Sequence, residues 1–145
     1  MRNIQFYIGW LGTLILGSLI YVFFRTTTLR MFCWFGQLNI LSFIDRFRVS
    51  TLFLKNYLPN WFLYSLPDGL WIFSYLSLAL YIWKNELKSE NLFWIFSIPI
   101  IAIGSEIGQL IKIIPGTFDI IDLIIYVLGT ILPFIIFKKL VTHKY

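Results

Sequence analysis

Residues 102–126 read AIGSEIGQLIKIIPGTFDIIDLIIY, a mostly apolar stretch that contains two pairs of polar side chains. The members of each pair are three residues apart: Glu106 with Gln109, and Asp119 with Asp122. Residues with this spacing lie on one face of a helix. A proline and a glycine separate the pairs, so we predict a helical hairpin that directs the four polar groups toward one another. Ionisable groups inside membrane helices are costly, and their default interpretation is functional.

The composition predicts an integral membrane protein. The chain has 145 residues, of which 59% are hydrophobic and only 13% are charged, whereas soluble domains carry about 25% charged residues. This length suits one domain that comprises residues 1–145. The single cysteine, Cys33, excludes an internal disulfide and the usual thiolate metal sites. We expect no cofactor and no metal site.

Four apolar segments have the length that a membrane span requires, which is about 20 residues. They cover residues 4–24, 66–83, 92–114 and 118–137. We therefore predict an all-α integral membrane protein, a bundle of four transmembrane helices. Ser65 is expected to cap the second helix, with Pro67 in the first turn and Asp68 at the third helical position.

The segment between the first two predicted spans is too long for a simple turn. Residues 31–44 are apolar but too few to cross a bilayer, and residues 46–55 interleave Arg46, Arg48 and Lys55 with apolar side chains. Such mixing is typical of helices that lie in the membrane interface. We therefore expect an interfacial or re-entrant segment between helices 1 and 2.

Helix geometry predicts that all four spans bring polar groups to one leaflet. At about 1.5 Å per residue, Glu106 lies below the far membrane face, while Arg25 ends the first span and Asp68 begins the second. We predict a ligand-binding cluster that comprises Arg25, Asp68, Glu106, Gln109, Asp119, Asp122 and Tyr126. The candidates for binding a headgroup phosphate are Arg30, Arg46 and Arg48.

These residues also have a structural interpretation. Asp68 and Asp119 lie in first helical turns, where a carboxylate interacts favourably with the helix dipole. Glu106 and Asp122 lie too deep for capping, and in this alternative they form interhelical hydrogen bonds or ion pairs. The G-x-x-x-G step at residues 104–108 is interpreted as a surface for close helix packing.

The charge distribution predicts the orientation. With four spans, each side of the membrane carries six lysines and arginines, so the positive-inside rule gives a tie. Five carboxylates lie on the side of the predicted cluster and two on the other. If the five pair with arginines, the uncompensated positive charge lies with the termini. We therefore expect a multi-pass protein of the cytoplasmic (inner) membrane with both termini in the cytoplasm.

Motifs in the C-terminal part of the chain resemble the signature of the VanZ-like membrane protein family. They are Glu106-x-x-Gln109, Phe118-Asp119-x-x-Asp122, and Gly129 seven residues further on. The predicted four-span layout is also similar. The resemblance implies an integral protein of the cell envelope, and the namesake of the family lowers susceptibility to the lipoglycopeptide teicoplanin. Gly116, Tyr126 and Pro133 stand where family members often have arginine, asparagine and glycine.

Three functions fit these observations. In the first, a non-enzymatic, VanZ-like envelope protein binds a lipid or glycolipid headgroup, or a partner protein, at the outer leaflet. In the second, the chain is a small structural subunit of a larger membrane protein complex. In the third, it is a membrane enzyme that acts on a lipid-linked substrate. The expected partners are membrane lipids or other membrane protein subunits, and not nucleic acid, because the charge of +5 is dispersed.

Overall fold

The computed structural model describes residues 7–84 and 86–137, and these form helices joined by turns and loops, with no strand among them. In chain order the elements are η1 (Ile8–Gly12), α2 (Thr13–Phe24), α3 (Arg30–Gln37), α4 (Leu41–Thr51), η2 (Leu52–Asn56), α5 (Asn60–Tyr64), α6 (Leu66–Ile82), α7 (Ser89–Leu110) and α8 (Ile120–Ile136). The predicted all-α class is confirmed. Residues 4–6 of the first predicted span, and both chain termini, lie outside the described residues.

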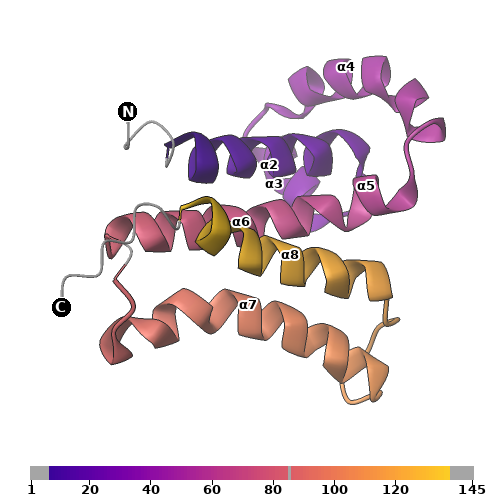
Figure 1. Cartoon of the computed structure of the whole chain (residues 1–145). Coiled ribbons are helices and arrows are strands. Elements are labelled where there is room, and N and C mark those ends of the chain that lie inside the picture. The colour runs from indigo at the N-terminus through magenta and orange to yellow at the C-terminus, as the bar shows by residue number, and fades with distance from the viewer. Residues whose placement is uncertain (1–6, 85, 138–145) are drawn as a thin grey trace.

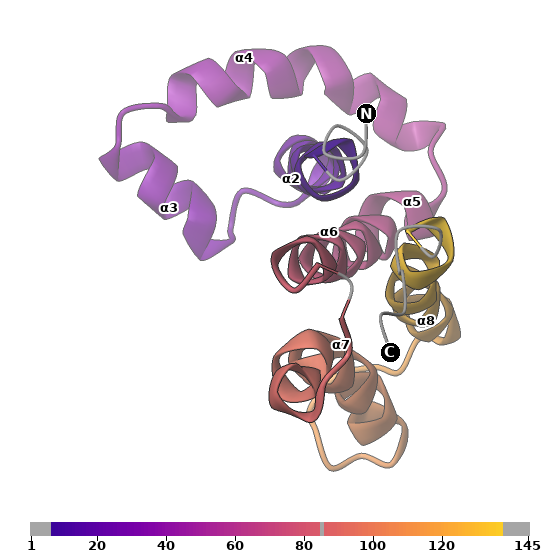
Figure 2. The same ribbon diagram turned by 60° about the vertical axis from the view of Figure 1, so that its left-hand side comes forward.

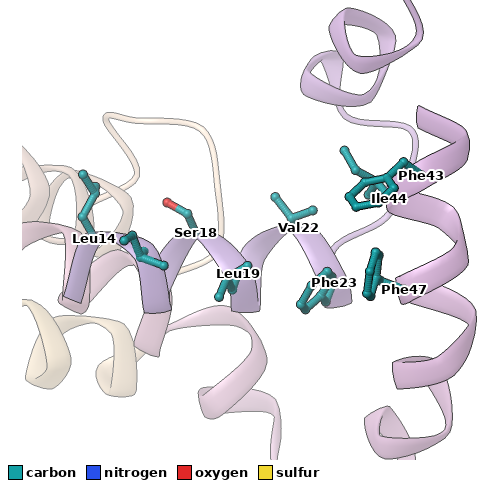
Figure 3. Close-up of a pocket in the computed structure, with 9 residues that line it drawn as sticks. Leu14, Ser18, Leu19, Val22, Phe23, Phe43, Ile44 and Phe47 are labelled. Carbon is teal, nitrogen blue, oxygen red and sulfur yellow. The ribbon is translucent and has the colours of Figure 1, made fainter. Parts of the chain in front are cut away.

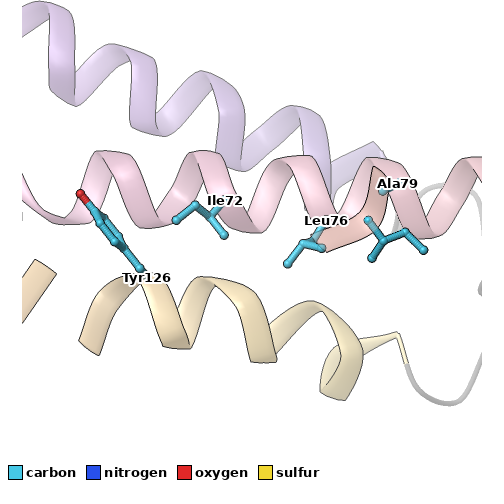
Figure 4. Close-up of a cluster of buried hydrophobic side chains, with 5 residues drawn as sticks. Ile72, Leu76, Ala79 and Tyr126 are labelled. Carbon is cyan, nitrogen blue, oxygen red and sulfur yellow. The ribbon is translucent and has the colours of Figure 1, made fainter. Parts of the chain in front are cut away.

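Helix α6 lies at the centre of the fold. Figure 1 shows α2 along one side of it, α8 along another and α7 beyond, with directions that alternate along the chain. Ile72, Leu76 and Ala79 follow the helical spacing of one face. They pack with Ile95 of α7 and Tyr126 of α8 in a buried core (Figure 4). Helices α7 and α8 therefore both pack against this apolar face of α6.

Glycines bring α2 and α8 close to α6. A β-carbon at Gly17 of α2 would lie 3.1 Å from the carbonyl oxygen of Pro67, and Gly129 of α8 also meets the α6 backbone. The G-x-x-x-G step of α7 does not have this role. No atom lies within 4 Å of a β-carbon at Gly104, and Gly108 is covered by the loop that follows α7. The prediction of close helix packing through this step is wrong.

Helices α5 and α6 form one nearly continuous helix, and Ser65 is not the cap that we predicted. The backbone of Ser65 is helical (φ −89°, ψ −42°), and its side chain makes no capping hydrogen bond. The Ser65 N–H donates to the Trp61 carbonyl (3.0 Å), and the Ser65 carbonyl accepts from the Gly69 N–H (3.2 Å). Pro67 lacks the N–H that would complete the turn between the two helices. Asp68 therefore lies within a longer helix rather than at a free N-terminus.

Helix α7 is displaced toward the N-terminus relative to its predicted range of 92–114. It begins three residues earlier, where the Asn91 side-chain oxygen accepts a hydrogen bond from the Lys88 N–H (2.9 Å). It ends at Leu110, and Lys112 beyond it has a left-handed backbone (φ 60°) that a helix cannot continue through. The loop between α7 and α8 is consequently longer than the sequence pattern indicated.

Helix α4 crosses the C-terminal end of α2, as Figure 2 shows. Arg48 makes this contact and is only 6% exposed. Its guanidinium donates to the carbonyl oxygens of Val22 and Arg25, the latter at 2.7 Å, and lies 4.6 Å from the centre of the Phe32 ring. The last carbonyls of a helix lack partners within the helix. Arg48 therefore completes the end of α2 and holds α4 across it.

Among the described residues, α7 is the one helix that is long and apolar enough to cross a membrane. Three apolar helical segments are shorter: Ile8–Phe24, Leu66–Ile82 and Ile120–Ile136. They coincide closely with the other three predicted spans, because the same apolar runs that suggested the spans form these helices. The segment between the first two predicted spans consists of short helices and their connections.

Candidate functional site

Four helix ends gather the predicted polar residues in one region. Figure 1 shows that the end of α2, the start of α6, the end of α7 and the start of α8 lie at the same end of the fold. The alternating helix directions produce this arrangement, because each connection reverses the chain. We refer to the group at this end as the polar cluster; it comprises Arg25, Asp68, Glu106, Gln109, Asp119, Asp122 and Tyr126.

Arg25 and Asp68 form the polar link between α2 and α6. Arg25 Nη2 lies 4.0 Å from Asp68 Oδ2, and both side chains are partly exposed. The guanidinium lies 5.1 Å from the centre of the Tyr21 ring and 4.9 Å from that of Tyr64, and it donates to the Tyr64 carbonyl oxygen (3.3 Å). Cation–π attraction favours this position between two rings. Arg25 is thus held in place while Asp68 remains accessible.

Tyr126 connects Asp68 to α8. It is a buried residue of the core, and its hydroxyl lies near enough to the Asp68 carboxylate to interact with it electrostatically. Figure 4 shows the ring extending from α8 toward α6, with the hydroxyl beyond Ile72. Arg25, Asp68 and Tyr126 therefore link α2, α6 and α8 in one polar chain. Asp122 and Glu106 lie close enough to Asp68 to interact with it electrostatically.

Glu106 and Asp119 connect α7 to the start of α8. Glu106 is 4% exposed, and its Oε2 accepts a hydrogen bond from the Asp119 N–H (3.4 Å). The Asp119 side chain accepts one from the Ile121 N–H (2.8 Å), which is the geometry of an N-cap. The capping interpretation of Asp119 is confirmed. Glu106 satisfies the backbone of the residue that caps the next helix, so it has a structural contact whatever else it does.

Asp122 and Gln109 differ from their predicted positions. The prediction that Asp122 lies below the first turn, too deep for capping, placed it too far into the helix: it lies in the first turn of α8, where a carboxylate interacts favourably with the helix dipole. Gln109 turns toward the connection between the helices: a β-carbon at Gly116 would lie 2.8 Å from Gln109 Cδ. The two residues of the E-x-x-Q motif therefore make different contacts. Glu106 contacts the start of α8, and Gln109 contacts the loop that precedes α8.

The polar cluster is acidic overall. It holds one arginine against four carboxylates: Asp68, Glu106, Asp119 and Asp122. Within the described ranges, no three His, Cys, Asp or Glu side chains converge closely enough to hold a metal ion. Carboxylates also accept hydrogen bonds from amines and hydroxyl groups, and a charged amine adds charge complementarity. Asp119 is exposed and Asp68 and Asp122 are partly exposed, so a ligand can reach these three carboxylates, whereas Glu106 is buried.

The three predicted phosphate-binding arginines fall into two groups. The guanidinium of Arg48 is buried and committed to backbone carbonyls and to Asp45, whose Oδ1 lies 3.9 Å from Arg48 Nε. Arg30 and Arg46 are exposed and form no ion pair with another described residue. Only Arg30 and Arg46 therefore retain a guanidinium with free donors.

Sequence reasoning missed the aromatic environment of Arg25. Tyr21 lies four residues before Arg25, and Tyr64 lies four residues before Asp68. This i,i+4 spacing places each tyrosine on the same helix face as its charged neighbour, so the signal was present in the sequence. The anchoring role of Arg48 had no comparable signal, because its partners are main-chain carbonyls more than twenty residues away.

The opposite end of the fold carries a simpler ion pair. Lys88 Nζ lies 2.7 Å from Glu86 Oε2, and both side chains are mostly exposed. Lys88 lowers the pKa of Glu86, and Glu86 raises the pKa of Lys88.

Comparison with known proteins gave no match to a family model, to a curated protein or to a solved structure.

Proposed function

We propose that this chain is a multi-pass integral protein of the cell envelope, similar to the VanZ-like family, whose polar cluster binds a lipid or glycolipid headgroup without catalysing a reaction. Its outward surface supports a membrane location. Ile100, Ile101 and Ile135 are each more than 60% exposed on α7 and α8, and monomeric soluble proteins rarely leave large contiguous apolar patches in water. Lipid tails accept such a surface at no cost.

Helix lengths are compatible with four spans. Helix α7 has 22 residues, and α6 and α8 have 17 each, which is the lower end of the spanning range of about 17–25 residues. The continuation of α6 into α5 extends that helix to the run 60–82, about 34 Å long at about 1.5 Å per residue. The run 60–82 and α7 therefore match the hydrocarbon thickness of about 30 Å, and α8, about 26 Å long, is slightly shorter.

One observation carries the binding proposal: the acidic cluster adjoins an apolar groove. The groove has a volume of about 260 Å³ and lies between α6 and α8, where Gly69 and Gly129 are among its lining residues. Asp68 directly precedes Gly69. Asp122 shares a helix face with Ile125 and Gly129, which both line the groove. An acidic region at the end of an apolar groove suits a ligand with a polar head and an acyl chain.

The charges favour a headgroup with an amine or several hydroxyl groups. Asp122 and Asp68 supply carboxylates for such donors, while the Arg25 guanidinium beside Asp68 supplies a positive charge that attracts phosphate. In a low-dielectric setting these interactions are stronger than in water. A zwitterionic phospholipid such as phosphatidylethanolamine carries both an amine and a phosphate, and an amino sugar on a lipid carrier offers similar groups.

The charge pairing also supports the proposed orientation. Arg25 lies against Asp68, and Arg48 lies against Asp45, so two of the arginines on the cluster side are compensated. Among the described residues, one ion pair, Lys88 with Glu86, lies on the side of the termini against these two, so fewer positive charges are compensated on that side. The positive-inside rule assigns that side to the cytoplasm, and the polar cluster to the outer leaflet.

Native mass spectrometry of the full chain in nanodiscs tests the binding proposal. The bilayer contains phosphatidylethanolamine and phosphatidylcholine with identical acyl chains, which differ only in the methylation of the amine. We expect preferential retention of phosphatidylethanolamine, which Asp122→Asn reduces. Glu86→Gln, at the opposite end of the fold, is the matched control and leaves retention unchanged. Equal retention by Asp122→Asn and the unmodified chain contradicts the proposal.

A second candidate is a structural subunit of a larger membrane complex. The contacts of Glu106 with the Asp119 backbone and of Asp68 with Arg25 favour this candidate. In both contacts a carboxylate already has a partner on a neighbouring helix or helix end, so it stabilises the fold without a ligand. In this case the same mass spectra contain further protein chains in a fixed ratio. Asp122→Asn then lowers the yield of folded protein instead of altering the lipid that a folded protein retains.

A further inference from the structure

A second apolar groove lies on the other side of the fold, between α2 and α4. It has a volume of about 540 Å³, which is within the range of about 300–1,000 Å³ for ligand sites. Leu14, Ile15 and Leu19 line it from α2, and Phe43, Ile44 and Phe47 line it from α4. Figure 3 shows Leu14, Leu19 and Val22 spaced along α2, with Phe43, Ile44 and Phe47 of α4 at one end of the row. The groove is thus long, apolar and closed at one end by α4.

A specific contact holds the groove open. Arg48 fastens α4 to the carbonyls of Val22 and Arg25 at the end of α2, and its neighbour on the chain, Phe47, stacks edge-on against Phe43 with ring centres 4.9 Å apart. Both rings are at least half exposed. The α4 wall is therefore fixed by a buried arginine while its aromatic edge remains uncovered.

A basic residue borders this apolar site. Arg46 follows Phe43 by three residues and precedes Phe47 by one, so it lies beside the lining face of α4. It is exposed and forms no ion pair with any other residue in the described ranges. Asp45, the nearest acidic residue along α4, is directed to Arg48. The free positive charge at the closed end of the groove complements an anionic group.

We propose that this groove binds an anionic phospholipid, with one acyl chain along α2 beneath α4 and the phosphate at Arg46. The inference rests on the membrane location proposed above and adds a site with the opposite charge preference to the acidic cluster. Interfacial helices commonly combine an apolar face with basic residues that attract anionic lipids. A symmetric dimer through this face would bury both copies' Arg46 side chains without an acidic partner, so a lipid fits better than a second copy.

Photo-crosslinking of the full chain in nanodiscs tests this site. The bilayer is phosphatidylcholine with a trace of phosphatidylglycerol or phosphatidylcholine that carries the same diazirine-labelled acyl chain. Labelled peptides are mapped by mass spectrometry. We expect phosphatidylglycerol to label the α2 and α4 segments about fivefold more than phosphatidylcholine does, which is the preference that one surface arginine supplies. Arg46→Gln should remove this preference, and Lys88→Gln, a basic residue at the opposite end, should preserve it.

The outcomes separate failure of this site from failure of the membrane proposal. Equal labelling of α2 and α4 by both lipids, or labelling spread evenly over the exposed faces of α7 and α8, overturns the site while leaving the membrane location intact. A chain that does not enter the bilayer and is labelled nowhere overturns both. Leu19→Trp fills the groove from an exposed lining position on α2, away from α4, which carries Arg46. It should lower phosphatidylglycerol labelling as well, and unchanged labelling contradicts the proposed acyl-chain position.

Discussion

Gly129 of α8 lies directly against Gly69 of α6, so closely that a β-carbon at Gly129 would approach the Gly69 carbonyl oxygen to 2.5 Å. This contact is backbone against backbone, and no side-chain rotation relieves it. It also sets the separation between Asp68, next to Gly69, and Tyr126, one turn before Gly129, which interact electrostatically. The separation of these two helices therefore determines both the packing of the core and the geometry of the polar cluster.

Gly129→Ala is expected to destabilise the fold. The added methyl group forces α6 and α8 apart, and overpacking of this kind costs about 1–3 kcal/mol. Gly104→Ala is the matched control, because nothing lies within 4 Å of its β-carbon, and alanine in a helix is favoured over glycine by roughly 0.5–1 kcal/mol. Unfolding of the purified variants in detergent, followed by circular dichroism, measures both. Equal stability of the two variants contradicts the proposed contact.

Arg48→Gln is expected to release α4 from the end of α2. The buried guanidinium donates to the carbonyl oxygens of Val22 and Arg25, and hydrogen bonds of charged groups contribute about 1.5–3 kcal/mol. Arg46→Gln, two residues earlier and exposed, should change the free energy of unfolding by less than about 0.5 kcal/mol. Limited proteolysis of the connection around residues 52–59 gives an independent measure, since a released α4 exposes it.

The apolar runs and turn residues carry enough information to predict the helices, but not how their backbones meet. Asp119 could be identified as a cap because capping depends on the next two residues only. Ser65 misled the prediction because its local pattern is that of a cap, whereas the preceding residues continue the helix through it. The roles of Arg48 and Gly129 depend on contacts with main-chain atoms of distant segments. The periodicity of side chains along the sequence does not predict such contacts.

The candidate site was predictable to the same extent. The convergence of Asp68, Glu106 and Asp122 at one end follows from helix lengths and alternating directions, which are sequence properties. The different roles of these three carboxylates do not follow from the sequence. Glu106 is buried against a backbone N–H and Asp68 is partly open, although both are single carboxylates in apolar segments, because burial depends on how the neighbouring helices pack.

Glu106→Gln and Glu106→Leu should separate the charge of this residue from its hydrogen bond. Glutamine retains an oxygen that accepts from the Asp119 N–H, so we expect folded protein in normal yield and a loss of stability below about 1 kcal/mol. Leucine removes the acceptor and leaves that N–H without its partner, at a cost of about 1–3 kcal/mol. Thermal unfolding in detergent measures the difference. If both variants are equally unstable, the charge itself is needed for folding.

Tyr126→Phe should weaken the link between α8 and Asp68 while preserving the core. The ring packs against Ile72 and Ile95, and phenylalanine keeps that contact, so the change removes only the hydroxyl near the Asp68 carboxylate. The loss of stability should stay below about 0.6 kcal/mol, the average for hydrogen bonds between helices in membranes. Asp68, without the nearby hydroxyl, then depends on Arg25 and on the ligand for its remaining interactions. Retention of phosphatidylethanolamine in native mass spectra should therefore be unchanged or increased in Tyr126→Phe, whereas Asp68→Asn should reduce it; a parallel loss in both variants would instead indicate that the tyrosine hydroxyl contacts the headgroup itself.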